Sequence, residues 1–175
     1  ERNRYRRVER LERILEYSFK DRDLAMRALT HSSYGDGQSG VANNERLEFL
    51  GDRVLGLMTA EILFHHSREA EGTLARRLNA LVRKETCAAV ARKIGLGDCV
   101  LISGAEDRQG GRDKDSILGD ACEALIAALY LDGGMATAQR FFNSHWKDEF
   151  DRVVSRSAKD PKTELQERAM AKNHS

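Results

Sequence analysis

The hydrophobic residues of this 175-residue chain recur at helical spacing along most of its length. Apolar side chains that repeat every three or four positions are typical of amphipathic helices covering a common core. The single proline also favours long, uninterrupted helices. We therefore predict an all-α protein. The expected helices cover approximately residues 8–15, 22–29, 44–66, 73–82, 84–94, 117–131 and 136–154.

Polar and glycine-containing segments separate these predicted helices. Asp21 is expected to cap the second helix, because an aspartate side chain accepts hydrogen bonds from the free backbone N–H groups of the first helical turn. The composition of 35–40 (GDGQSG) and of 103–116 (SGAEDRQGGRDKDS) predicts loops. Glycines at 95 and at 133–134 are expected to end the helices before them.

The length and composition fit one domain with a short extension. Hydrophobic residues make up 41% of the chain, which is enough for a core. We assign residues 1–154 to this domain and 155–160 to a linker. Asp160 and Pro161 then form a helix-start signal, so 161–175 is interpreted as the N-terminal stub of a second domain.

Several classes of protein are not indicated by the composition. The chain has no apolar run of about 18 residues and begins with a charged segment, so neither a membrane span nor a signal peptide is expected. Its three cysteines lack the paired spacing of a zinc site or a disulfide framework. These features favour a cytoplasmic protein.

The net charge of +1 does not by itself indicate nucleic-acid binding, but the charges are unevenly distributed. Residues 1–13 contain six arginines and three glutamates. Such a segment is either a solvated helix face or a local patch that can bind phosphates.

The segment 43–52, NNERLEFLGD, places three acids within the long helix predicted over 44–66. At about 100° per residue, Glu45, Glu48 and Asp52 lie within about 60° of one another on one edge of that helix. This arrangement alone is compatible with an ordinary solvated face.

A second acidic pair makes a cation site credible. Asp120 and Glu123 share a helical face and are the only acids between residues 117 and 131, a segment with no Lys or Arg. Buried carboxylates require a basic partner, a raised pKa or a metal ion. A partner from elsewhere in the fold therefore remains an alternative to a metal. Oxygen ligands from several acids suit Mg²⁺, and two such ions promote phosphodiester cleavage.

At this point the motifs closely resemble the ribonuclease III family of double-stranded-RNA endonucleases. The resemblance rests on NNERLEFLGD together with ALTHSSY at 28–34, EGTLARRLNALV at 71–82, GGRDKDSILGDACEALIAALYLDGG at 110–134 and DPKTELQE at 160–167. These segments follow the order and spacing of the family from about residue 8 to the end of the chain.

The resemblance implies the all-α endonuclease domain fold, working as a homodimeric helical bundle on double-stranded RNA. The cofactor would be Mg²⁺, for which Mn²⁺ can substitute, acting in a two-metal mechanism. The products would carry 5′-phosphate and 3′-hydroxyl ends with two-nucleotide 3′ overhangs. The activity implied is the processing of ribosomal RNA, messenger RNA and other structured precursors. Residues 161–175 would begin a double-stranded-RNA-binding domain.

The resemblance also assigns roles to individual residues. The catalytic and metal-binding acids would be Glu48, Asp52, Asp120 and Glu123, with Asp52 supporting the shell of the other three. Accessory acids would be Glu45 and Glu71. The aromatic ring of Phe49 would insert into the partner subunit, although ordinary core packing is the alternative for this residue.

Contacts to RNA are also expected, at Asn44, which would border the active site, and at Arg112 and Lys114, which would touch phosphates unless they are merely solvated. Asn44 is in addition a plausible helix cap. Some family members carry arginine where this chain has Leu78, and Arg77 is expected to take over that RNA contact.

Two other classes of function compete with an RNA endonuclease. A non-enzymatic binding module would be favoured by the loss of one of the four acids, and all four are present. A non-haem iron bundle would require Glu-x-x-His pairs, which the sequence lacks.

Overall fold

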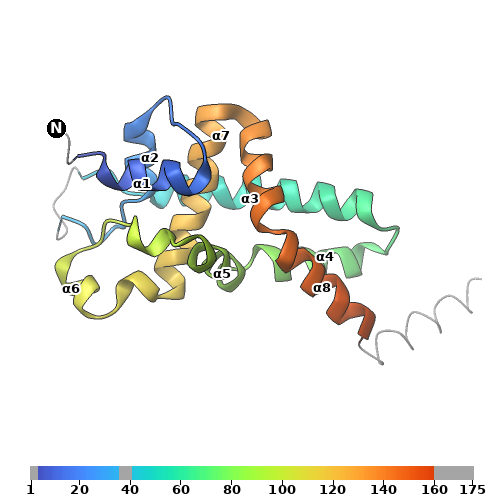
Figure 1. Cartoon of the computed structure of the whole chain (residues 1–175). Coiled ribbons are helices and arrows are strands. Elements are labelled where there is room, and N and C mark those ends of the chain that lie inside the picture. The colour runs from blue at the N-terminus through green and yellow to red at the C-terminus, as the bar shows by residue number, and fades with distance from the viewer. Residues whose placement is uncertain (1–3, 36–40, 160–175) are drawn as a thin grey trace, which may run out of the picture.

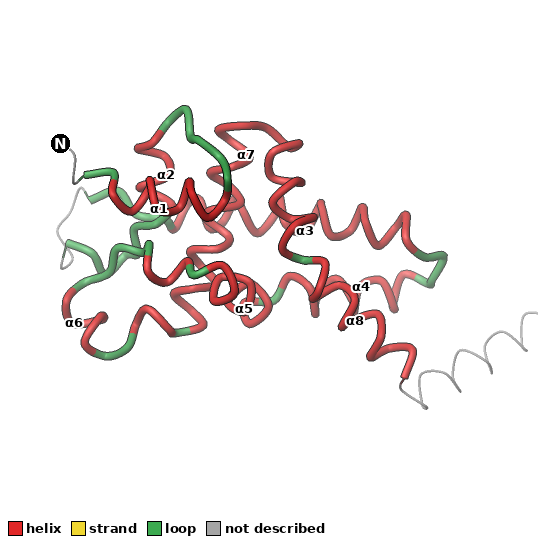
Figure 2. The backbone as a smooth tube through the Cα atoms, in the orientation of Figure 1, coloured by secondary structure: helices red, strands yellow, loops and turns green. Residues whose placement is uncertain are grey.

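The computed structural model describes residues 4–35 and 41–159, and regular structure in these ranges is helical (Figure 2). The predicted all-α fold is confirmed. One isolated parallel bridge joins Thr30 to Leu101. The α-helices are α1 (Arg6–Leu15), α2 (Arg22–Ala28), α3 (Glu45–His66), α4 (Glu71–Val82), α5 (Lys84–Ile94), α6 (Gly104–Arg108), α7 (Asp115–His145) and α8 (Lys147–Lys159).

The centre of the fold is the packing of α7 against α3 and α5 (Figure 1). The first half of α7 is buried almost continuously, which explains its apolar sequence from Ile117 to Leu129. At Gly51 of α3 the two long helices touch through their backbones. A Cβ atom at this position would lie only 1.7 Å from the carbonyl oxygen of Glu123.

The predicted start of the second helix is confirmed, because the side chain of Asp21 accepts a hydrogen bond from the Leu24 N–H at 3.1 Å. The turn before it is fastened to α7 by Asp132. That carboxylate accepts hydrogen bonds from the Tyr17 hydroxyl at 2.5 Å and from the backbone N–H groups of Lys20 and Asp21. The middle of α7 thus fixes the connection between α1 and α2.

The segment 103–116, predicted as a loop, is more ordered than its composition suggests. It contains α6, a 3₁₀ turn over Gly111–Asp113 and the first residues of α7. Ser103 caps α6 by accepting a hydrogen bond from the Glu106 N–H, and Gly110 separates the two turns with a φ of 78°. The loop prediction was therefore wrong here, because local capping makes short helices from a polar sequence.

The boundaries of the last helices also differ from the prediction. The glycine pair does interrupt the helix, since Gly134 takes a non-helical φ of 79° within α7. The helix predicted over 136–154 is broken at Trp146, whose buried indole N–H donates to the carbonyl of Leu81. Residues 155–159, predicted as linker, continue α8.

Some predictions concern residues outside the part of the chain that the structure describes. They are the end of the linker at residue 160, the domain stub over 161–175 and most of the loop at 35–40. Among the described helices, each is too short or too polar to cross a membrane.

Candidate active site

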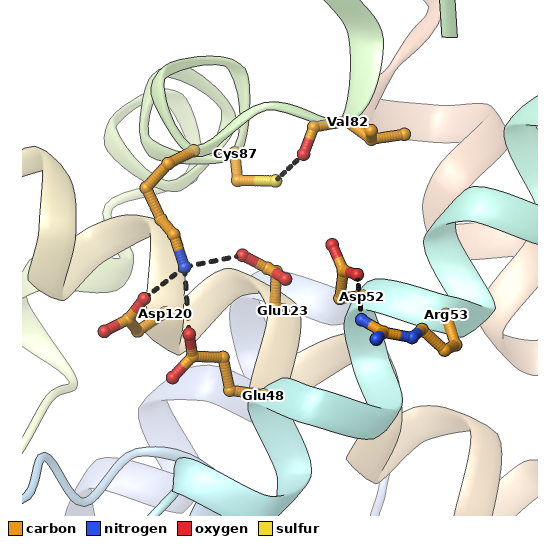
Figure 3. A network of polar contacts seen from close by, with 8 residues as sticks. Glu48, Asp52, Arg53, Val82, Cys87, Asp120 and Glu123 are labelled. Carbon is orange, nitrogen blue, oxygen red and sulfur yellow. Dashed lines mark hydrogen bonds and ion pairs between the residues drawn. The ribbon is translucent and has the colours of Figure 1, made fainter. Parts of the chain in front are cut away.

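Three of the four predicted catalytic acids, Glu48, Asp120 and Glu123, converge. Glu48 and Glu123 line a cleft of about 540 Å³ that residues of α3, α4, α5 and α7 enclose. Glu48 comes from the first turn of α3, and Asp120 and Glu123 come from α7 (Figure 3). One carboxylate oxygen from each lies within 4.8 Å of the others. Residues 72 positions apart in the sequence thus form one cluster.

Close helix packing makes this convergence possible. The backbone contact at Gly51 brings the start of α3 against the turn of α7 that carries Glu123. A Cβ atom at Gly119 would lie 2.4 Å from the Cδ atom of Lys84, so this glycine lets the lysine side chain cross α7. Each glycine lies next to or within one turn of a clustered acid.

Lys84, the first residue of α5, lies at the centre of the cluster. Its Nζ atom is 3.0 Å from Glu48 Oε1 and 2.8 Å from Glu123 Oε1, and it also bonds Asp120 Oδ1. The basic partner that the sequence of α7 lacks is therefore supplied by another helix. Sequence reasoning missed Lys84, because nothing in its local pattern links it to acids 36 positions away.

The cluster remains short of positive charge. One ammonium group faces three carboxylates, so full ionisation leaves an excess of two negative charges. Burial raises the pKa of Glu123 to about 7, although its hydrogen bond with Lys84 acts in the opposite direction. Burial likewise raises the pKa of Glu48. Burial alone would lower the pKa of Lys84, but its bonds to the acids outweigh that effect and raise it.

These residues fit a hard divalent cation. The donors are carboxylate oxygens, which Mg²⁺ prefers, and their unbalanced charge favours a cation between them. The side chain of Glu123 is only 5% exposed, so it cannot relieve its charge by turning to solvent. The residues able to hold the ion are Glu48, Asp120 and Glu123.

Asp52, the fourth predicted acid, lines the same cleft but is not one of the three converging groups. Its Oδ2 atom pairs with the guanidinium of Arg53 at 2.6 Å (Figure 3). The same guanidinium lies 4.6 Å from the ring centre of Phe49. Asp52 therefore lies beside the three clustered acids and pairs with Arg53 instead of Lys84.

The two predicted accessory acids lie in different places. Glu45 lines the cleft beside Glu48. Glu71 begins α4, whereas the α4 residues that line the cleft, Asn79 and Val82, lie toward the other end of that helix. At 1.5 Å per residue, Glu71 and Asn79 are about 12 Å apart along α4. Within one subunit, the structure does not bring Glu71 to the clustered acids.

The side chains predicted to contact RNA mostly have partners within the protein. Arg112 donates to the carbonyl oxygens of Gly97 and Val100 and pairs with Asp107. Lys114 pairs with Glu106 at 3.0 Å. In this structure Arg112 therefore fastens the α6 region to the core, and only Lys114 keeps substantial exposure, with 42% of its side chain accessible.

Asn44 is buried, and its amide donates to the carbonyl of Ala28 at 3.2 Å. It occupies the N-cap position of α3 without a capping side-chain bond; Asn43 instead accepts from the Glu45 N–H. Asn44 is therefore the N-cap residue as predicted, but the side chain that accepts from the first turn is that of Asn43. Asn44 ties α3 to α2 and so fixes the turn that carries Glu48.

Arg77 was expected to replace a missing RNA contact, and the structure contradicts this. Its side chain is 9% exposed, and Nη1 pairs with Glu69 at 2.6 Å. A buried, paired guanidinium cannot reach a phosphate on the surface. The helical spacing did not reveal this, because the partner lies in the preceding loop.

Comparisons with known proteins identify the family of this chain. Residues 21–149 match the family model described as ribonuclease-III-like. The chain is 55% identical to ribonuclease 3 of Caulobacter vibrioides, over 90% of its own length and 68% of that protein. It is 53% identical to ribonuclease 3 of Phenylobacterium zucineum, over 91% and 68%.

The fold is also shared with solved structures. The nuclease domain of ribonuclease III from Campylobacter jejuni superposes with a TM-score of 0.76 at 43% identity, covering 82% of this chain and 99% of that one. A second structure of that domain gives a TM-score of 0.74 at 44% identity, covering 82% and 95%. The converging acids, the helical architecture and these similarities lead to one assignment: the chain belongs to the ribonuclease III family, and its described helices form the endonuclease domain of that family.

Proposed function

We propose that this chain hydrolyses phosphodiester bonds within double-stranded RNA in a Mg²⁺-dependent reaction. The observation that carries the proposal is the convergence of Glu48, Asp120 and Glu123. The single ammonium group among them does not balance their three negative charges. The products would have 5′-phosphate and 3′-hydroxyl ends with two-nucleotide 3′ overhangs. The substrates would be ribosomal RNA and other structured precursors in the cytoplasm.

The three clustered acids would hold the metal ions, with Asp52 supporting them from the side. Two bound Mg²⁺ ions would supply an activated water and stabilisation of the leaving oxygen. Lys84 pairs with all three carboxylates and offsets part of their mutual repulsion. Glu45, at the mouth of the same cleft, is the accessory acid placed to act within one subunit.

The recognition of RNA would depend on shape. An A-form duplex presents a wide minor groove with 2′-hydroxyl groups, which proteins contact without reading sequence. Arg83 is exposed and lines the acid cleft. Lys114, directly before α7, is partly exposed, with 42% of its side chain accessible. Both would position phosphates near the cluster.

The first experiment follows the cleavage of an end-labelled RNA duplex by the wild-type chain at low salt. We expect cleavage with Mg²⁺ and none after EDTA, because the carboxylates need the ion to act on a phosphodiester. Low salt is chosen because binding to phosphates weakens steeply as salt is raised. Binding of the duplex without cleavage at any Mg²⁺ concentration would instead favour the binding module.

We further propose that the active form is a homodimer formed through α3. Phe49, Leu57 and Phe64 are 64%, 56% and 71% exposed and lie within about 80° of one another around this helix. Core packing, the alternative role for Phe49, does not fit this exposure. Leu131 of α7 is also exposed and shares a hollow of about 530 Å³ with Phe49. A ring beside a hollow is self-complementary under twofold symmetry.

The dimer is tested by replacing Leu57 with Asp. The expected result is at least a ~100-fold weaker self-association, because the symmetric interface would bury two new carboxylates. Sedimentation of the wild type and of Leu57→Asp at micromolar concentration measures this change. His65→Asp is the matched control, since His65 is exposed on the same helix but about 80–160° away from the apolar residues. A wild-type chain sedimenting as a stable 19.7 kDa monomer would contradict the proposal.

A further inference from the structure

A cavity lined by arginines lies beside the N-terminal helix, outside the acid cleft. Its volume is about 690 Å³, within the range of cavities that bind ligands. We call it the N-terminal arginine cavity. Its charged lining residues are Arg4, Arg6, Arg7, Arg10 and the single acid Asp98.

The positive charge of this cavity is poorly neutralised. Arg4 pairs with Asp23 at 3.3 Å and Arg10 pairs with Asp98 at 3.2 Å, but more than half of each of these side chains is exposed. Exposed pairs of this kind are weak and open readily to a competing anion. Arg6 is exposed and forms no ion pair with the residues that the structure describes.

Arg7 supplies the most specific feature of the cavity. Its Nη1 atom donates to the carbonyl oxygens of Asp98 and Val100, both at 3.1 Å. The same Val100 oxygen accepts from Arg112 at 2.7 Å, which places two guanidinium groups side by side. Burial and the charge of Arg112 both lower the pKa of Arg7. Among the described residues, the Nε and Nη2 atoms of Arg7 have no partner, which leaves a planar pair of donors suited to a phosphate.

The rest of the wall is apolar and partly aromatic. Tyr34 is 43% exposed and Val41 is 36% exposed, and both line the cavity. A surface with arginine donors beside an exposed ring can take a phosphate together with its attached sugar. This favours an RNA backbone over a free inorganic anion, which would gain nothing from the apolar wall.

The cavity lies close enough to the acid cleft to contact the same RNA molecule. Ala42 lines the cavity, and Glu48 lies six residues further along the chain. At about 3.5 Å per residue, the two positions are at most about 21 Å apart. A duplex carries phosphates every few ångströms along its axis, so one bound at the acids extends past such a distance.

We propose that the N-terminal arginine cavity binds phosphates of the RNA backbone next to the segment held at the acid cleft. The inference rests on the proposed function, because it takes double-stranded RNA as the substrate. The cavity contributes to affinity and to the position of the duplex. Bond cleavage takes place at the acids and does not involve the arginines.

The test is the replacement of Arg6, which is exposed and whose loss leaves the helix contacts intact. Binding of a labelled duplex is measured in a Glu123→Gln background with Mg²⁺, where no cleavage is expected. We expect Arg6→Ala to weaken binding about 3- to 10-fold. The slope of log affinity against log salt concentration should fall by about one, which corresponds to the loss of one phosphate contact.

Arg13→Ala is the matched control, since Arg13 is an exposed arginine of the same helix outside the cavity lining. An equal loss of RNA affinity in Arg6→Ala and Arg13→Ala would show that only the general positive charge of the helix matters, and this would overturn the proposal. Unchanged affinity in both variants would also overturn it. A rise in melting temperature with pyrophosphate alone, combined with unaltered RNA binding in Arg6→Ala, would identify a small-anion site instead. The binding result is readable even if the wild type does not cleave, so failure of the nuclease proposal is a separate outcome.

Discussion

Replacing Glu123 with Gln is expected to lower the cleavage of duplex RNA by at least about a thousandfold, which corresponds to roughly 4 kcal/mol of transition-state stabilisation. Glu123 is the most buried acid of the cluster, with 5% of its side chain exposed. Gln has nearly the same shape but no negative charge to hold a metal ion. The measurement is the single-turnover cleavage rate at saturating protein and Mg²⁺.

The loss in Glu123→Gln should not come from unfolding. Lys84 keeps its contacts with Glu48 and Asp120, so the substitution leaves no unpaired charge in the core. Burying a carboxylate itself costs free energy, and Gln avoids that cost. We therefore expect a melting temperature at least as high as that of the wild type. Glu61→Gln, an exposed acid on α3 outside the cleft, is the control and should cleave normally. Equal rates for Glu123→Gln and the wild type would remove Glu123 from the active site.

Replacing Gly51 with Ala is expected to cost about 3 kcal/mol of folding stability. The added Cβ would lie 1.7 Å from the carbonyl oxygen of Glu123. The Cβ is fixed to the backbone of α3 and the oxygen belongs to the backbone of α7, so neither atom can move without its helix. Helices α3 and α7 must therefore move apart, which also shifts Glu123 relative to Glu48. Thermal unfolding should show a fall in melting temperature on the order of 10 °C. Cleavage at low temperature, where the protein stays folded, should fall as well.

Gly72→Ala is the control for this substitution. Gly72 lies in the first turn of α4, where a Cβ atom would meet only the side chain of Arg76 at an ordinary 3.8 Å. Alanine has the higher helix propensity, so stability should stay the same or rise by up to about 1 kcal/mol. If Gly51→Ala melted like Gly72→Ala, the helices would not be in backbone contact and the site would be held together in another way.

The helices were largely predictable because each carries its own signal. Periodic apolar residues located α1, α3, α4 and α5, and local chemistry placed the Asp21 cap and the Gly95 end. One helix boundary was predicted wrongly because its determinant is a distant contact. The break at Trp146 depends on a hydrogen bond to Leu81, 65 positions earlier, which no local pattern contains.

The acids of the site were also predictable, but their surroundings were not. The helical spacing of Asp120 and Glu123 predicted that they share one face of an apolar helix. The resemblance to the family motif identified Glu48 and Asp52 as site residues. The internal partners of Arg112 and Arg77 were not predictable either, because they come from other segments of the chain. Whether a charged residue faces solvent is a property of the packed fold.

By itself the sequence determined the helical class and the positions of most helices. It also indicated that the two acids of α7 need a basic partner, a raised pKa or a metal ion. Only the tertiary structure decided what that partner is and how far it reaches. Lys84 enters the cluster because α5 packs on α7 at Gly119, and Glu48 enters it because α3 meets α7 at Gly51. Both contacts join residues more than 30 positions apart, and they form only when the helices pack closely enough for their backbones to touch.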